Sequence, residues 1–141
     1  GVDASAEMLA QAVRRAEALG RPAELRQGDT DELPLPDAGA DTVVATLLLC
    51  SVPDVAGTLA EFARVLRPGG RLLLLDHVAS SWAPVRALQA VADRVTASTG
   101  ECWRRRPLDG LRAAGFEVES VAASRGRLVE AVAARRIVSV S

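Results

Sequence analysis

Two acidic stretches near the amino-terminal end of the chain have the residue types that could bind a nucleoside. Asp3 lies in "GVDASAEML", between a short apolar run and a helix, and Asp29 lies in "GDTDELP", after a second strand candidate. In a doubly wound sheet, ligands bind beyond the carboxyl ends of the strands. A carboxylate there can accept hydrogen bonds from ribose hydroxyls. As alternatives, Asp3 is a loop carboxylate that assists the helix start at Ser5, and Asp29 is an ordinary turn acid.

The only histidine, His77, follows an apolar strand and is expected at the same edge of the sheet. A histidine there could act as a general base or contact a substrate, because imidazole exchanges protons near neutral pH. The alternative, which we favour, is a partly buried ring that is hydrogen-bonded to a neighbour. The run Arg104 to Arg106 could steer an anionic substrate, but a charge run before a helix is more often a solvated surface.

Cys50 and Cys102 stand far apart, without a CxxC or Cys/His spacing, so no metal site is predicted. We expect both to be reduced, half-buried packing thiols of a cytoplasmic protein. Trp82 and Trp103 could cover an apolar pocket, although burial against helices explains them equally well.

The length of 141 residues predicts a single domain over residues 1–141. A net charge of −1 gives no indication of a nucleic-acid partner. No apolar run approaches the ~20 residues of a membrane-spanning helix, and no export leader opens the chain, which favours a cytoplasmic location.

The elements that position these residues follow from periodicity and punctuation. Ser5 is expected to cap a helix that Gly20 and Pro22 end, and Asp54 a helix that ends at the tight turn "RPGG". The other expected elements are a weak strand over 23–27, buried strands over 41–52 and 71–76, a helix starting at Ser80 or Ser81, a short helix from Pro107 to Gly115, and an antiparallel hairpin of "FEVESVAA" and "RLVEAVAA".

Continuous apolar strands that alternate with helices predict an α/β, Rossmann-like three-layer sandwich. Its sheet is expected to be mostly parallel and covered on both faces, with the antiparallel hairpin at the carboxyl-terminal end.

The order of "GVDASAEML", "GDTDELP", "ADTVVATLLLCSVPD", "EFARVLRPGG" and "LLLLDHV" resembles a class I S-adenosylmethionine-dependent methyltransferase of the methyltransferase type-11 group. The resemblance covers nearly the whole chain, and "LRPGG" is among its more specific parts. "TLLLCSVPD" with "DHV" is similar to a branch that includes small bacterial enzymes and alkyl-thiol methyltransferases. The ubiquinone and menaquinone C-methyltransferases share the pattern more loosely.

The resemblance implies S-adenosylmethionine as the methyl donor and a small, apolar molecule as the acceptor. It also implies roles for six cofactor-binding residues: Asp3 for the ribose, Ala4 packed on adenine, Asp29 for the adenine amino group, Thr30 beside the ring, and Thr46 and Leu47 under the methionine part. His77 is a weaker candidate near the acceptor. Methyl transfer needs little acid or base when the acceptor is nucleophilic, so alignment is the main task of the protein.

The family's first strand and its glycine-rich loop have no counterpart in these residues. In the family the strand order is 3-2-1-4-5-7-6, so strand 1 is central. We therefore expect an N-terminally truncated domain with a bare edge on strand 4, a loosely packed amino-terminal segment and weak or absent cofactor binding. A homodimer through that edge is a further expectation.

Two other function classes stay open. A non-catalytic fragment or pseudoenzyme that acts through self-association would account for the missing loop and the bare edge. A nicotinamide-dependent oxidoreductase would share the ribose-binding acid. It would not explain "GDTDELP" and "LRPGG" together, and the chain has no tyrosine for the short-chain type of hydride chemistry.

Overall fold

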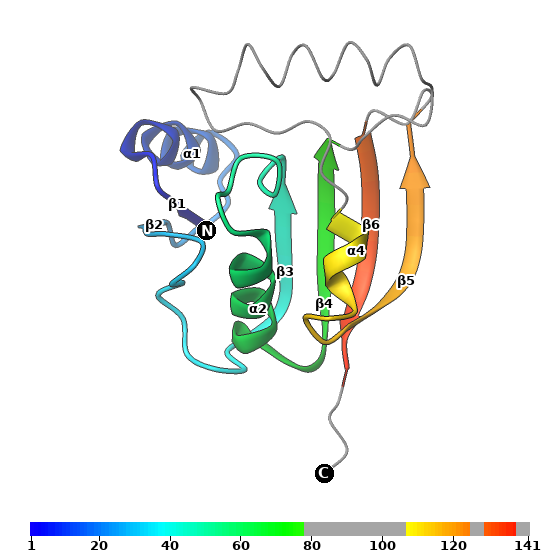
Figure 1. Ribbon diagram of the computed structural model, residues 1–141. Coiled ribbons are helices and arrows are strands. Elements are labelled where there is room, and N and C mark those ends of the chain that lie inside the picture. Colours follow the sequence, from blue (N-terminus) through cyan, green and yellow to red (C-terminus); the bar gives the residue numbers. More distant parts are fainter. Residues whose placement is uncertain (78–106, 125–128, 138–141) are drawn as a thin grey trace.

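The computed structural model describes residues 1–77, 107–124 and 129–137. The helix expected from Ser80 or Ser81 therefore lies outside the described residues. The elements, which Figure 1 shows, are β1 (Val2–Asp3), α1 (Ala6–Ala18), β2 (Arg26–Gln27), β3 (Ala40–Thr46), α2 (Val55–Val65), β4 (Leu66–His77), α4 (Pro107–Leu111), β5 (Phe116–Ala123) and β6 (Val129–Arg136). None of the described helices is both long enough and apolar enough to cross a membrane.

Four strands form the main sheet in the order β3-β4-β6-β5. β3 and β4 run parallel, while β6 is antiparallel to both β4 and β5. The carboxyl-terminal hairpin is therefore confirmed, with its second strand placed next to β4. This order matches the last four places, 4-5-7-6, of the sheet that the resemblance implies.

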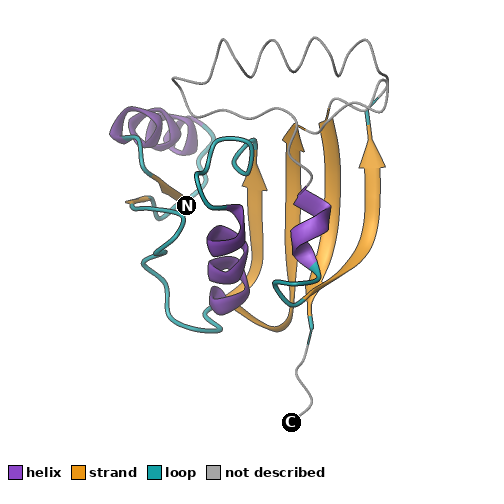
Figure 2. Cartoon of the chain, in the orientation of Figure 1, coloured by secondary structure: helices purple, strands orange, loops and turns teal. Residues whose placement is uncertain are grey.

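Helices α2 and α4 lie on the same face of this sheet (Figure 2) and form the core with it. Alternation along β4 explains the packing, because Leu72 and Leu74 are buried while Leu73 and Leu75 point to the other face. That other face is open in the described part of the chain, where Val44 is 67% exposed. The sequence predicts that helices cover both faces of the sheet. Among the described residues they cover only one face. The core residues from the helices are Leu59, Phe62 and Leu111.

Both helix starts have the predicted caps. The Ser5 hydroxyl accepts a hydrogen bond from Met8 N at 3.2 Å, and Asp54 Oδ1 accepts one from Ala56 N at 2.9 Å. Such bonds satisfy amides that have no partner within the helix. Helix α1 ends before Gly20, whose φ of 59° suits glycine, as expected.

The end of β3 and the start of β4 differ from the sequence-based expectation. β3 ends at Thr46 rather than continuing through residue 52, because Leu47 has a left-handed φ of 53° and the chain then turns. The "RPGG" stretch lies within the bounds of β4 as an irregularity instead of preceding the strand. The register with β3 shifts there, and Gly69 has a φ of 74°.

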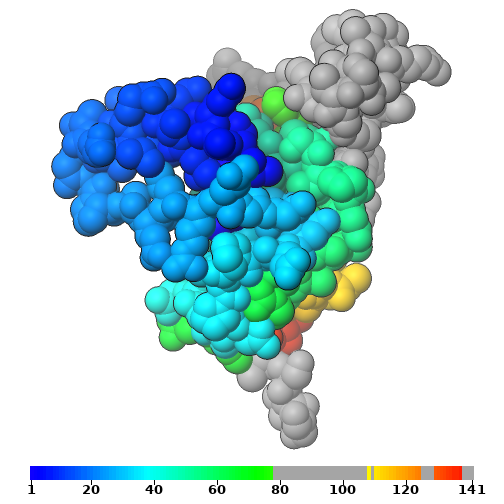
Figure 3. Space-filling view, turned by 90° about the vertical axis from the view of Figure 1, so that its left-hand side faces the viewer, coloured from blue at the N-terminus to red at the C-terminus, as the bar shows by residue number. Residues whose placement is uncertain are grey.

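The amino-terminal segment forms a separate unit. β1 and β2 make a two-stranded parallel sheet of their own, and α1 contacts these two strands but has no buried residue. The apolar residues of this segment are largely exposed, as Val13 at 42% and Leu19 at 54% illustrate. Figure 3 shows this blue segment standing out from the body, with openings beside it. The expected loose packing is therefore present.

The loop that carries the "GDTDELP" acids is fixed to the main sheet through the polar face of α2. Arg64 forms a bidentate pair with Glu61 at 2.7 and 2.8 Å and reaches Asp37 at 2.6 Å. Its guanidinium also donates to the carbonyls of Leu33 and Leu35, and Glu61 Oε1 accepts from Leu33 N at 2.7 Å. The hydrogen bonds from Arg64 lower the pKa of Glu61, against the opposing effect of burial.

The interaction of Glu61 with Arg64 predicts a specific pH dependence of stability. Because the pKa of Glu61 is lower in the folded state, its contribution is complete above the ordinary glutamate value of about 4.3 and is lost as the pH falls through the folded-state value. We expect Glu61→Gln to reduce the free energy of unfolding at pH 7 and to flatten the profile in that acidic range. Urea unfolding at several pH values measures both. An unchanged acidic profile in the variant would contradict this role of Glu61.

Candidate functional site

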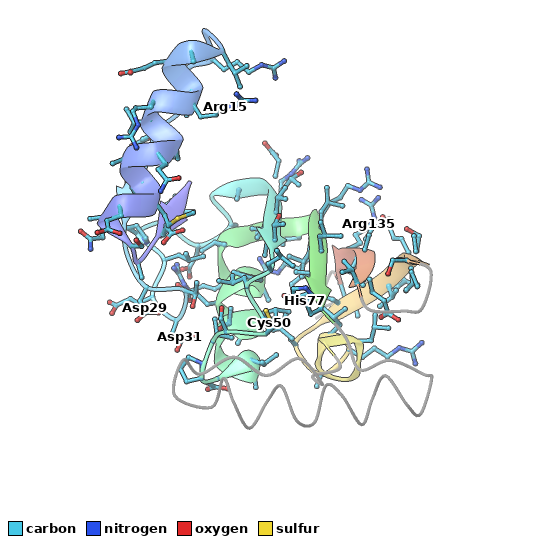
Figure 4. The ribbon with its side chains drawn as sticks, turned by 90° about the horizontal axis from the view of Figure 1, so that it is seen from above. Arg15, Asp29, Asp31, Cys50, His77 and Arg135 are labelled. Atoms are coloured by element: carbon cyan, nitrogen blue, oxygen red, sulfur yellow. The ribbon has the colours of Figure 1, made fainter. Side chains whose placement is uncertain are left out.

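The carboxyl ends of β3 and β4 form one edge of the main sheet, and polar groups gather there. Figure 4 views the molecule from above this edge, with Cys50 and His77 side by side and Asp29 and Asp31 on the side of the amino-terminal unit. Parallel pairing of β3 and β4 produces this arrangement, because Thr46 lies opposite Leu75 and the two strands therefore end close together.

Asp3 is the last residue of β1, Asp29 follows the neighbouring parallel strand β2, and both are exposed. Gly28 N donates to Asp3 O at 3.2 Å, so the two strand ends are joined directly before Asp29. Asp3 Oδ1 accepts a hydrogen bond from Ser5 N at 2.8 Å, and Gln27 Nε2 donates to Ala4 O at 2.9 Å. These contacts fix the local orientation of the first predicted site residues and bring both acids to the same end of the small sheet.

The second acid of the "GDTDELP" loop, Asp31, has a structural partner that the sequence does not reveal. The hydroxyl of Thr58 lies 2.7 Å from Asp31 Oδ1, and Thr58 is fully buried in α2. Asp29 Oδ1 accepts from Asp31 N at 3.4 Å, which links the exposed acid to the anchored one. Asp31 therefore ties the loop to α2 and leaves Asp29 at the surface.

Asp76 holds the turn that follows β3. Its Oδ2 accepts from Leu49 N at 2.6 Å and its Oδ1 accepts from His77 N at 2.8 Å, while the residue is only 2% exposed. Leu47 N donates to Leu75 O at 2.7 Å just before this turn. Together these bonds leave Thr46 and Leu47 exposed at the carboxyl end of β3. Ligands of parallel sheets bind at this end of the strands.

His77 is half-buried and lies beside two groups that spacing alone does not connect to it. Donor atoms of Cys50, Asp76 and His77 all lie within 4.8 Å of one another. Cys50 is buried rather than half-buried, and it is not part of a disulfide, as expected of a reduced packing cysteine. Sequence reasoning missed the cluster because it depends on the register between β3 and β4. Cys102, the two tryptophans and the Arg104 to Arg106 run lie outside the described residues.

A cavity of about 480 Å³ lies between the amino-terminal unit and β3, and Thr30 is the one predicted site residue that lines it. Val2, Arg26 and Thr30 line it from the amino-terminal unit, and Thr42 and Val44 line it from β3. The structure thus brings Asp3, Ala4, Asp29 and Thr30 together on one side. It brings Thr46, Leu47 and His77 together on the other.

Comparisons with known proteins show the family to which the chain belongs. A family model described as a methyltransferase domain matches residues 1–74. A phosphatidylethanolamine N-methyltransferase from Cereibacter sphaeroides is 40% identical over 102 residues, which are 71% of this chain and 50% of that protein. A ubiquinone/menaquinone biosynthesis C-methyltransferase from Caulobacter vibrioides is 35% identical over 122 residues, 85% of this chain and 46% of that protein. The chain spans about half the length of these curated relatives.

Solved structures show the same fold at lower identity. A SAM-dependent methyltransferase from Methanosarcina mazei matches 99% of this chain and 82% of its own, with a TM-score of 0.78 at 21% identity. A geranyl diphosphate methyltransferase solved in complex with SAM matches 97% of this chain and 68% of its own, with a TM-score of 0.78 at 19% identity. The Rossmann-like fold class predicted from the sequence is confirmed. With more than half of its residues matched by the family model, the chain belongs to the type-11 methyltransferase-domain family, whose methyl donor is S-adenosylmethionine.

Proposed function

We propose that this chain takes part in methyl transfer from S-adenosylmethionine to a small, apolar acceptor. Family membership supports the reaction class. The observation that carries the proposal for this chain is the position of Asp3 and Asp29 at the ends of two paired parallel strands, where both residues are exposed. Two acids so placed match the hydrogen-bonding groups of an adenosine, which offers ribose hydroxyls and an exocyclic amine.

The described residues fit the nucleoside half of the donor. One oxygen of Asp3 is engaged by Ser5 N, which orients the carboxylate while its second oxygen stays available to ribose hydroxyls. Ala4 has no bulky side chain to obstruct a flat base, and Asp29 and Thr30 follow β2 alongside it. On this proposal Thr46 and Leu47 line the floor under the methionine part.

When bound, S-adenosylmethionine supplies an activated methyl group on a sulfonium. The chain then has to hold donor and acceptor in line, and alignment of this kind accounts for much of the rate enhancement in two-substrate reactions. Leu47, 47% exposed after β3, offers an apolar surface at this edge, which supports an apolar acceptor. The relatives named for phosphatidylethanolamine and for ubiquinone/menaquinone biosynthesis are compatible with it. His77 is the candidate for contact with the acceptor.

Calorimetric titration with S-adenosylhomocysteine tests the cofactor assignment. We expect Asp3→Asn to weaken binding roughly 10- to 100-fold, as loss of a hydrogen bond to a charged group worth about 1.5–3 kcal/mol would do. Asp41→Asn is the matched control, because Asp41 is equally exposed but lies at the amino end of β3 and pairs with Arg67. Equal affinities of the Asp3 variant and the parent chain would contradict the ribose role.

Self-association is the second candidate function, and the free edge of β3 favours it. Leu47 N bonds to Leu75 O, and N–H groups alternate between the two edges of a strand, so the backbone groups of Thr42, Val44 and Thr46 point away from β4. β3 ends the sheet among the described residues, and the 480 Å³ cavity lies along this edge. Such an edge is a template for another strand, and we propose a second copy of the chain as its source.

Light scattering after gel filtration tests this edge. Val44→Pro removes an outward N–H and should shift a dimer toward the monomer, whereas Val44→Thr keeps that N–H and should leave the dimer intact. An oligomer that gives no heat with S-adenosylhomocysteine would support the non-catalytic alternative. A parent chain that is monomeric at all concentrations would contradict pairing between copies.

We also propose a cytoplasmic location and no nucleic-acid partner. The absence of an export leader among these residues and the net charge of −1 are the grounds for these two proposals. Cell fractionation tests the first, and a gel-shift assay with mixed-sequence DNA and RNA tests the second.

A further inference from the structure

Three side chains that can bind metal ions meet where β3 and β4 leave the sheet. Cys50 comes from the turn after β3, while Asp76 and His77 end β4. Their sulfur, oxygen and nitrogen donor atoms lie within 4.8 Å of one another, and Figure 4 shows Cys50 and His77 adjacent in the centre of the molecule. The three residues belong to two strand ends, so the parallel register is what creates the cluster.

The burial and charge of Asp76 point toward a cation. Its carboxylate is 2% exposed and Cys50 is 7% exposed, yet no arginine among the described residues pairs with Asp76. Two backbone amides, those of Leu49 and His77, bond to its oxygens and fix their direction. Buried carboxylates in proteins are commonly paired with a basic group or coordinate a metal ion.

We propose that Cys50 Sγ, an Asp76 carboxylate oxygen and a His77 ring nitrogen bind one divalent transition-metal ion of the zinc type. Thiolate, imidazole and carboxylate are the ligands that zinc accepts, at about 2.0–2.3 Å from the metal. In a tetrahedral site these bond lengths put the donors about 3.5 Å apart, so a spread within 4.8 Å closes by side-chain rotation.

The surrounding hydrogen bonds suit such a site. The amides of Leu49 and His77 would act as outer-shell partners that hold the Asp76 carboxylate in place, a role that metal-binding carboxylates commonly require. Binding replaces the thiol proton of Cys50, and that proton passes to solvent. Each carboxylate oxygen has a second lone pair, so coordination does not require either amide bond to break.

Three protein ligands leave one position of a tetrahedral ion open, as in catalytic rather than structural zinc sites. The three ligands themselves lie at the carboxyl ends of β3 and β4, the same end of the sheet at which Thr46 ends β3. If the proposed methyl transfer is correct, the open position is available to a nucleophilic atom of the acceptor. Only this consequence rests on the proposed function, because the ion site itself is independent of cofactor binding.

The test uses the purified chain, freed of metal by a chelator and titrated with Co²⁺ and then Zn²⁺ without cofactor. We expect one equivalent of Co²⁺ to bind with a thiolate-to-cobalt absorption band, and Zn²⁺ to displace it. Cys50→Ala and His77→Gln should each weaken binding by more than the about 10- to 100-fold that loss of an outer-shell partner costs. Cys102→Ala is the matched control and should leave the absorption band unchanged.

Several results would overturn the site. They are the absence of a stoichiometric complex with the parent chain, a cobalt spectrum without the thiolate band, or equal loss of binding in Cys102→Ala. The parent spectrum alone decides the matter if a cluster variant does not fold. Because no methyl donor is present in the titration, failure of the ion site and failure of the proposed function give separate results.

Discussion

The carboxylate of Asp76 is the constraint on which the geometry of the candidate site depends. It accepts hydrogen bonds from Leu49 N and His77 N, and so joins the turn after β3 to the end of β4. This joint stops β3 at Thr46 and leaves Leu47 in a left-handed conformation. A single buried acid therefore holds together the carboxyl ends of β3 and β4. The same acid brings Cys50 next to His77.

A second constraint acts on the amino-terminal side. The loop with Asp29 is fixed to α2 through Thr58, Glu61 and Arg64, whereas α1 itself buries nothing. One group of predicted site residues therefore lies on the small separate sheet and the anchored loop, and the other group lies on the main sheet. The 480 Å³ cavity lies along the unpaired side of β3, where the strand's backbone groups point away from β4. Pairing of another strand with the unpaired side of β3 would change how the two groups of predicted site residues lie relative to each other.

Local signals predicted much of the fold. The caps at Ser5 and Asp54, the end of α1 before Gly20 and the hairpin of β5 and β6 all follow from side chains acting within a few residues. The end of β3 at Thr46 was not predictable, because Asp76 imposes it from another strand. The bulge at "RPGG" depends likewise on pairing with β3. Apolar periodicity identified α1 but gave no information on whether its stripe would meet a partner, and in the described residues it stays exposed.

The same distinction applies to the site. Position near a strand end was the basis for predicting Asp3, Asp29 and His77 as site residues, and their roles stay predictions. The Cys50–Asp76–His77 cluster needs the register between two strands. The central claim is that two separate groups of residues contact one adenosine-containing ligand. Amide chemical shifts in ¹⁵N-labelled protein, recorded during titration with S-adenosylhomocysteine, test it most directly. The account predicts that signals at Asp3 and Ala4, at Asp29 and Thr30, and at Thr46 and Leu47 move together with one dissociation constant. Shifts limited to one group, or none at these residues, would contradict it.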